Sequence, residues 1–250
     1  MIYLCCDNEK TGEILSRKFS SEAIRFTVLL YYKSYGTSFD FAQYYIQFDE
    51  ELNTETAIIM RYNQTIYILT KSECDVSELS SFVSGFADSE VIYDGGAGPL
   101  QIDCKSENIG AVMSRKGTDD SVQNTAVTLI NEPKLVTNLV GENMSENVKT
   151  DFFLNTAHQM RHNLLKVYGV MLDKKLVSTA SVFDADSEQS LIHFVYTGEH
   201  FRGNGYSRQI LQAICSDISV DYLLLCEEHN INFYEKCGFT LSDSWVYYRL

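Results

Sequence analysis

One short segment near the end of the chain constrains its fold more than any other feature. Residues 200–207 read His-Phe-Arg-Gly-Asn-Gly-Tyr-Ser and lie between an apolar run, 191–196, and a helical pattern. A strand, a glycine-rich turn and a helix start direct several unpaired backbone N–H groups at one place, at the positive end of the helix dipole. Gly203 and Gly205 permit a tight turn, and Arg202 adds a cation. The segment therefore predicts a binding site for a pyrophosphate.

Two common glycine-rich nucleotide sites do not fit this loop. A P-loop ends in Gly-Lys followed by Ser or Thr, whereas Gly205 is followed by Tyr206. A Rossmann fingerprint needs a third glycine, and an acidic residue about 20 residues further on, within a βαβ unit near the start of a domain. Position 208 is arginine, and the chain ends soon after it. The pyrophosphate is therefore expected to belong to another kind of ligand.

The loop instead resembles the acyl-CoA loop of the GNAT superfamily of N-acyltransferases, whose pattern is Gln/Arg-x-x-Gly-x-Gly/Ala. Arg202, Gly205 and Ser207 occupy the three fixed places, with a small serine where the family has glycine or alanine. A second segment, residues 232–239, reads Asn-Phe-Tyr-Glu-Lys-Cys-Gly-Phe and is similar to the family's Phe/Leu-Tyr-Glu-Lys-x-Gly-Phe. The resemblance covers roughly residues 150–250.

This resemblance implies the residues of an acyl-CoA site. The pyrophosphate is expected on the loop, and the pantetheine arm along the backbone of the preceding strand, where the family has a bulge. The implied contact residues are Val195, Tyr196, Thr197, Arg202, Gly203, Asn204, Gly205, Tyr206 and Ser207. Asn230, four residues before Tyr234 on the same expected helical face, competes with Asn232 for a hydrogen bond to the cofactor.

The family places a tyrosine beside the cofactor sulfur, which here is Tyr234. A phenol with a pKa near ~10 stays protonated at neutral pH and can give its proton to a leaving thiolate, so Tyr234 is the expected general acid. The general base stays open between Glu227, Glu228 and water. His158 and His162 have the spacing of a zinc helix but lack the glutamate of that motif, so no metal is expected.

Composition narrows the class of protein. The chain has 250 residues, of which 45% are hydrophobic and 22% charged, as in a globular protein with a sizeable core. The net charge of -14 is shared by both halves and argues against a nucleic-acid partner. Neither a membrane-spanning apolar run nor a signal-peptide pattern is found. The 7 cysteines lack metal-type spacing, which indicates reduced thiols and a cytoplasmic protein.

The order of expected elements predicts an α+β fold, with a GNAT-type mixed sheet flanked by helices. The first half reads as helical spacing over 10–34, three strands of which the last two meet in a turn at Asn63, a helix, a strand and a glycine-rich turn over 94–99. Residues 104–131 show no clear pattern. The second half reads as two helices, three strands, a helix over 207–219, a strand, a helix over 229–237 and a final strand. This similar order suggests two GNAT-like domains in tandem, an accessory domain at 1–122 and a GNAT N-acyltransferase domain at 123–250. Residues 71–75, without glycine and with two acids, stand where a second acyl-CoA loop would be.

The resemblance implies an N-acyltransferase that moves an acyl group from acetyl-CoA, or another acyl-CoA, to a primary amine of a small molecule or peptide. The alternative is a non-catalytic acyl-CoA-binding regulator in which Tyr234 only packs. An aminoacyl-tRNA-dependent ligase is disfavoured by the acidic charge and the intact phosphate loop. Neither nucleic acid nor a membrane is an expected partner, and a homo-oligomer is among the states that the sequence leaves open.

Overall fold

The computed structural model describes residues 1–119 and 126–250, and these form two compact units. The first unit comprises Met1–Val112, Leu225–Ile231 and Ser242–Leu250, and the second comprises Met113–Leu224 and Asn232–Leu241. The chain therefore returns to the first unit twice after it has entered the second. The expected boundary between residues 122 and 123 lies outside the described residues.

The first unit holds an open sheet with helices on both faces. Its strands run in the order β1-β2-β3-β4-β5-β12-β6, and the neighbours β4 and β5 are parallel. The strands are β1 (Ile2–Leu4), β2 (Ala42–Asp49), β3 (Thr54–Tyr62), β4 (Thr65–Thr70), β5 (Glu90–Tyr93), β6 (Ser106–Lys116) and β12 (Thr240–Arg249), the last two shared with the second unit. The helices are α1 (Asn8–Leu15), α2 (Glu22–Tyr35) and α3 (Val76–Val83).

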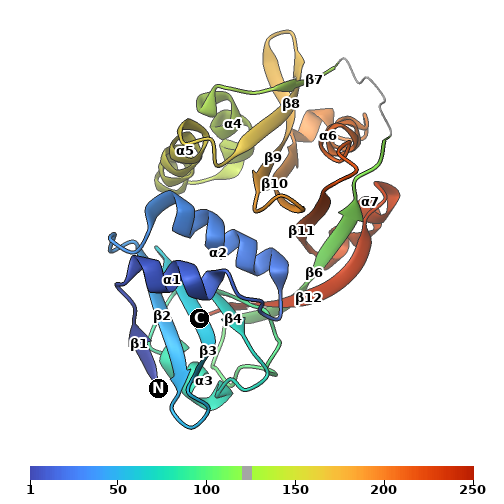
Figure 1. Ribbon diagram of the computed structural model, residues 1–250. Helices are drawn as coiled ribbons and strands as arrows, with labels where there is room; N and C mark the ends of the chain where they lie inside the picture. The colour runs from blue at the N-terminus through green and yellow to red at the C-terminus, as the bar shows by residue number, and fades with distance from the viewer. Residues whose placement is uncertain (120–125) are drawn as a thin grey trace. The chain divides into compact units, whose positions relative to one another are not determined.

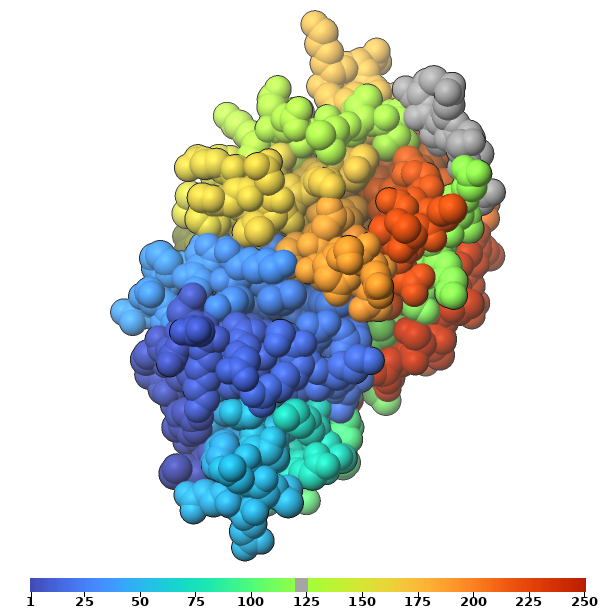
Figure 2. All heavy atoms as spheres, in the orientation of Figure 1, coloured from blue at the N-terminus to red at the C-terminus, as the bar shows by residue number. Residues whose placement is uncertain are grey.

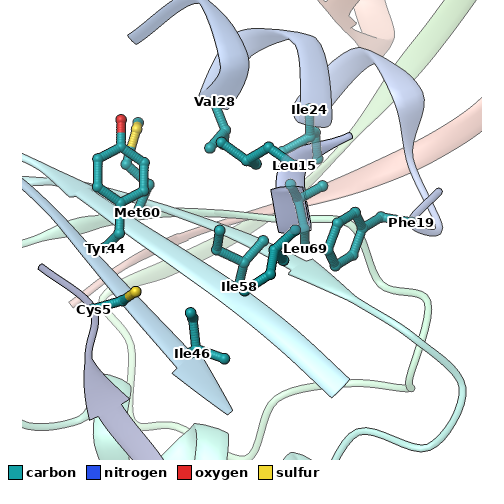
Figure 3. Close-up of a cluster of buried hydrophobic side chains, with 11 residues drawn as sticks. Cys5, Leu15, Phe19, Ile24, Val28, Tyr44, Ile46, Ile58, Met60 and Leu69 are labelled. Carbon is teal, nitrogen blue, oxygen red and sulfur yellow. The ribbon is translucent and has the colours of Figure 1, made fainter. Parts of the chain in front are cut away.

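Alternating side chains on β3 place this sheet between two helical layers. Ile58 and Met60 belong to a buried cluster with residues of α1 and α2, whereas Ile59 lies in a second cluster with Leu79 and Val83 of α3. Successive strand residues point to opposite faces, so one strand can serve both clusters. Figure 3 shows the first cluster, with Val28 and Ile24 of α2 above the strand side chains. Helices α1 and α2 therefore cover one face and α3 the other (Figure 1).

The second unit is built in the same way. Its strands run in the order β6-β11-β10-β9-β8-β7. Helix α4 packs on β9 and β10, α5 packs on α4, and α6 packs on β8, β9 and β10, on the other side of these strands in Figure 1. The elements are β7 (Val127–Leu129), α4 (Pro133–Val140), α5 (Glu146–Arg161), β8 (Lys166–Leu172), β9 (Lys175–Asp184), β10 (Gln189–Thr197), α6 (Tyr206–Ile214), β11 (Asp221–Glu227) and α7 (Ile231–Lys236).

The two units repeat one supersecondary order. In each, three antiparallel strands are followed by a helix and then by a strand parallel to the third. The parallel pairs are Thr65–Ile68 with Glu90–Tyr93 and Gln189–Ile192 with Asp221–Leu224. The turn of the β8–β9 hairpin, at Asp173 and Lys174, projects from the surface of the second unit (Figure 2). The repeated order supports the expectation of two GNAT-like folds in one chain.

Most expected elements are present, with differences at their ends. The helical spacing over 10–34 resolves into α1 and α2, because the Asp7 carboxylate caps α1 and residues 16–21 separate the two helices. The helix expected over 207–219 ends at Ile214, and the one expected over 229–237 begins only at Ile231. Strands β6 and β7 occupy the region where the sequence predicts no clear element. Among the described residues, no helix is long and apolar enough to span a membrane.

Candidate active site

The glycine-rich loop of the second unit ends at an uncapped helix. It leaves β10 through the short helix η2 (Glu199–Phe201) and enters α6 with Gly205 as the N-cap, at a φ of 76°. The first backbone bond of the helix is Gln209 N–H to Gly205 O at 3.1 Å. No side chain caps this helix end. The N–H groups of residues 206–208 therefore have no capping side chain among the described residues, and their binding of a pyrophosphate stays a prediction.

The loop has open space where a ligand would approach. A Cβ atom built on Gly203 or Gly205 meets no atom within 4 Å, and both glycines have positive φ values, 81° and 76°. The Asn204 amide donates to Phe201 O at 3.0 Å and so fixes the turn from inside. The Arg202 Nε donates to Thr197 O at 3.3 Å. This hydrogen bond keeps the Arg202 guanidinium beside the loop, at the end of β10.

Three hydroxyl groups anchor the loop to the sheet. Thr197 Oγ1 on β10 lies 2.5 Å from Ser207 Oγ on α6 and 2.8 Å from Ser178 Oγ on β9. Ser178 and Ser207 are themselves 3.3 Å apart. This explains why serine replaces the family's glycine or alanine at 207, since its hydroxyl has partners on both strands. Ser178 could not have been identified from the sequence, because nothing around it distinguishes it from other serines.

Strand β10 carries the expected bulge. Its register with β9 shifts between His193 and Tyr196, and Phe194 has a φ of 51°, which is rare for a bulky residue. The Phe194 ring packs edge-on against Phe152 of α5, with centroids 5.0 Å apart, which holds the strained residue in place. β10 pairs with β11 only from Gln189 to Ile192, and the described residues of this unit give 193–197 no further partner on that side. Backbone groups around Val195 are therefore turned away from the regular ladder.

His193 lies next to this bulge with its ring turned into the protein. Its Nε2 atom is buried without a hydrogen-bond partner among the described residues. Burial lowers the pKa of this imidazole to about 4, so His193 is neutral at physiological pH. His193 could not be identified from the sequence, because a single histidine in an apolar run gives no signal of its own.

Tyr234 is the residue of α7 with the most buried side chain, 8% exposed. Its ring packs edge-on against Phe233, at 5.0 Å, and Phe239, at 5.9 Å. The helix is only six residues long and ends at Lys236. Two arginines for which the sequence indicates no role at this helix donate to carbonyls at its end: Arg208 to Lys236 O, on the last residue of α7, and Arg115 to Cys237 O, on the residue after it, at 2.7 Å.

The other expected residues near Tyr234 lie just outside α7. Asn230 ends the short helix η3 (Glu228–Asn230), so the expected shared α-helical face with Tyr234 is wrong; the backbone tightens there to a 3-10 turn. The candidate bases Glu227 and Glu228 are both exposed, and Glu227 lies 3.3 Å from the imidazole of His229. Residues 225–231 belong to the first unit.

In the first unit, a side chain binds the backbone at the position that corresponds to the bulge of β10. After the last parallel pair, Ile68 with Tyr93, the Asp94 carboxylate accepts the Thr70 N–H at 2.7 Å and the Thr70 hydroxyl at 2.7 Å. It also accepts the Gly96 N–H at 3.2 Å. The glycine-rich segment after Asp94 is thus a turn around this carboxylate, as expected for residues 94–99.

The helix of the first unit that corresponds to α6 also differs in its start. The Asp75 carboxylate caps α3 by accepting the Glu78 N–H at 3.0 Å. Asp75 and Glu78 thus place two acids at the helix end where a phosphate would have to bind. An anion is repelled there, which agrees with the absence of glycine in residues 71–75.

His158 of α5 and His162, the residue that follows this helix, lie close together. The ring centroids of His158 and His162 are 4.4 Å apart, near the end of the helix. Among the residues that the structure describes, no group of three or more His, Cys, Asp or Glu side chains is arranged to hold a metal ion.

Comparisons with known proteins agree with this geometry. Residues 164–241 match the family model of the acetyltransferase (GNAT) domain. No curated protein sequence matches the chain significantly. Among solved structures, a tandem GNAT protein from the clavulanic acid biosynthesis pathway is 10% identical, with a TM-score of 0.60 over 100% of this chain and 98% of its own. A GNAT-family acetyltransferase from Colwellia psychrerythraea is 10% identical, with a TM-score of 0.55 over 100% and 99%.

A third structure, a putative GNAT-family acetyltransferase from Novosphingobium aromaticivorans, is 14% identical, with a TM-score of 0.57 over 78% of this chain and 87% of its own. At such identities the likeness is one of fold. The family model covers the loop, the bulged strand and Tyr234, all within the second part of the chain. Residues 164–241 are therefore similar to a GNAT acetyltransferase domain, and the chain has, along its length, the fold of a tandem GNAT protein.

Proposed function

We propose that the protein is an acyl-CoA-dependent N-acyltransferase, with acetyl-CoA as the default donor. The acceptor is a primary amine on a small molecule or peptide. The proposal places the donor in the second unit only, since Asp94 and Asp75 occupy the corresponding places of the first. The compartment that fits is the cytoplasm, because all seven cysteines are free thiols.

The observation that carries the proposal is the uncapped start of α6 directly after a strand with a bulge. The first-turn N–H groups and Arg202 supply the positive end that a pyrophosphate needs. The bulge of β10 frees backbone groups on the strand that precedes the loop. An extended amide-containing arm can pair with these groups as an added strand. An acyl-CoA has both chemical features in one molecule.

The chain's own residues have a limited chemical task in this reaction. The amine nitrogen forms a bond to the acyl carbon, the carbon–sulfur bond breaks, and the thiolate needs a proton. Tyr234 supplies that proton from its phenol and recovers one from water, while the amine gives its proton to water or to a carboxylate. Backbone N–H groups of the bulge are suited to stabilise the charge that develops on the acyl oxygen.

A second candidate function is a non-catalytic acyl-CoA-binding regulator. The observation in its favour is the burial of Tyr234, which is 8% exposed between Phe233 and Phe239, as a packing residue would be. In this case the loop binds the donor, but no group reaches the thioester sulfur.

Titration calorimetry with acetyl-CoA, followed by thiol release in the presence of a panel of primary amines, separates these functions. Binding together with amine-dependent thiol release supports the transferase. Binding without release from any amine in the panel supports the regulator. Absence of acetyl-CoA binding would remove both proposals, because each depends on the loop before α6.

A further inference from the structure

We propose that Arg115 is a positioning residue that fixes Tyr234 for proton transfer by holding the C-terminal end of α7. This inference rests on the proposed function. Arg115 lies on β6, more than 100 positions before the tyrosine, and no motif includes it. Its side chain nevertheless meets the segment that follows Tyr234 at several atoms.

The guanidinium of Arg115 makes directed contacts to a backbone carbonyl and to a hydroxyl group. Its Nη1 donates to Cys237 O at 2.7 Å, and its Nη2 donates to Thr118 Oγ1 at 3.0 Å. The carbonyl end of a helix carries a partial negative charge, so a cation stabilises it. A Cβ atom built on Gly238, which has a φ of 85°, lies 3.5 Å from the Arg115 Nε, in ordinary contact. The guanidinium thus packs closely on the turn that ends α7.

The contacts continue from Arg115 to the tyrosine. The Arg115 Cζ atom lies 6.0 Å from the centre of the Phe239 ring, and that ring packs edge-on against Tyr234 at 5.9 Å. The Phe239 N–H also donates to Tyr234 O at 3.1 Å. A helix of six residues gains little stability from its own hydrogen bonds. We therefore infer that the direction of the Tyr234 side chain depends on the contacts that other segments make with the ends of α7.

Arg208 provides the second hold on the same helix end. It is the third residue of α6, so its N–H belongs to the first turn, where the donor pyrophosphate is proposed to bind. Its guanidinium donates to Lys236 O of α7. One residue thus joins the phosphate-binding helix to the helix that carries Tyr234. Arg115 is the better residue to test, because its contacts lie away from the phosphate loop.

The test is a double-mutant cycle on acetyl transfer with the full chain. Arg115→Met keeps much of the apolar side chain and removes the donors. We expect kcat to fall by about 10- to 100-fold, the usual loss when a reacting group is displaced by about 1 Å. The KM for acetyl-CoA should stay within about threefold, because a displaced general acid affects only the chemical step. In a Tyr234→Phe background, the same substitution should change kcat by less than about threefold, since the proton is already missing.

Arg61→Met is the matched control. Arg61 also donates to a backbone carbonyl, Asn63 O at 3.0 Å, and lies over an aromatic ring, Phe86 at 5.4 Å, but in the first unit. It should leave kcat unchanged. If Arg115→Met does not fold, Arg115→Lys takes its place in the same cycle. Lysine keeps the charge but has one donor nitrogen instead of three.

Several results would overturn the inference while leaving the transferase intact. Equal losses of kcat from Arg115→Met with and without Tyr234 would show that Arg115 acts through stability or another group. A wild-type kcat in a folded Arg115→Met protein would show that α7 needs no such hold. A Tyr234→Phe protein with full activity would remove the acid role itself. A wild type without turnover is a different case, because it would remove the proposed function and this inference together.

An activity-independent measurement follows the position of the ring. In protein labelled with ¹³C at the tyrosine Cζ, the Tyr234 resonance is assigned by its loss in Tyr234→Phe. We expect this resonance to shift or broaden in Arg115→Met and to stay in place in Arg61→Met. An unchanged resonance in Arg115→Met would refute the positioning role.

Discussion

Replacing Asp94 with asparagine removes one buried charge from the first unit. It tests the role of the carboxylate that occupies the position corresponding to the β10 bulge of the second unit. Asp94 is 4% exposed and accepts hydrogen bonds from Thr70 and Gly96. Burial raises the pKa of its carboxyl from 3.8 to about 6, against the opposing effect of these hydrogen bonds. Asparagine keeps the shape of the side chain and does not titrate.

The sign follows from the raised pKa. Between pH 3.8 and about 6 the folded protein binds the proton of Asp94 more tightly than the unfolded chain does. The favourable contribution of this proton to the free energy of unfolding is full below the lower pKa and is lost as pH rises through about 6. A shift of about two units is worth at most about 3 kcal/mol, and about 2 kcal/mol of this falls between pH 4.5 and 7.5.

Urea unfolding of the wild type and Asp94→Asn at these two pH values measures the difference. Trp245, the single tryptophan of the chain, packs against a core cluster of the first unit, so its fluorescence reports on that unit. We expect the wild type to lose about 2 kcal/mol relative to the variant as pH rises from 4.5 to 7.5. Asp103→Asn, which removes an exposed carboxyl further along the same loop, is the control.

The reasoning is wrong if the difference between wild type and Asp94→Asn does not change with pH, or if the wild type gains relative stability as pH rises. Either result would mean that solvent reaches Asp94 and that burial does not raise the pKa of its carboxyl.

Three further predictions concern the donor site. Gly205→Asp should abolish coenzyme A binding in calorimetry, because it places a negative charge among the first-turn N–H groups and strains a residue at a φ of 76° by about 1–2 kcal/mol; unchanged affinity would contradict the assignment. Titration with coenzyme A should give one site per chain, and a stoichiometry of two would show that Asp94 and Asp75 do not exclude the ligand. Tyr234→Phe should lower kcat by roughly 10² to 10⁴ with acyl-CoA affinity held within a few fold; a full wild-type kcat would identify Tyr234 as a packing residue.

The geometry of the glycine-rich loop could be predicted because it depends on residues that are neighbours in the chain. Two glycines, an arginine and the start of a helix stand within a few residues, and the positive φ values of Gly203 and Gly205 are what such spacing requires. The strands were predictable for the same reason, since alternation and turn residues such as Asn63 operate over neighbours in the chain. The predicted bounds of α6 and α7 were less accurate, because helix ends depend on hydrogen bonds made by other segments.

The bulge of β10 shows where sequence reasoning stops. The family resemblance implied it, but the run from 191 to 196 carries no glycine to mark it. The positive φ of Phe194 is held by a ring of α5, about 40 residues away in the chain. The shared α-helical face expected for Asn230 and Tyr234 was wrong for a related reason, because a helical face can be extrapolated only while the backbone stays α-helical; the expected contact of Asn230 with the cofactor stays a prediction.

By itself, the sequence determined the class of fold and the order of elements, and it predicted a donor site, since these depend on periodicity and on contiguous residues. Only the tertiary structure decided which distant groups complete that site. Arg115 meets the end of α7 across more than 100 residues, and Ser178 anchors the glycine-rich loop from another strand. In the first unit, in the same way, Asp94 accepts the N–H of Thr70, 24 residues before it. Such pairings leave no periodic trace, because strand order in a sheet brings together residues whose spacing along the chain is arbitrary.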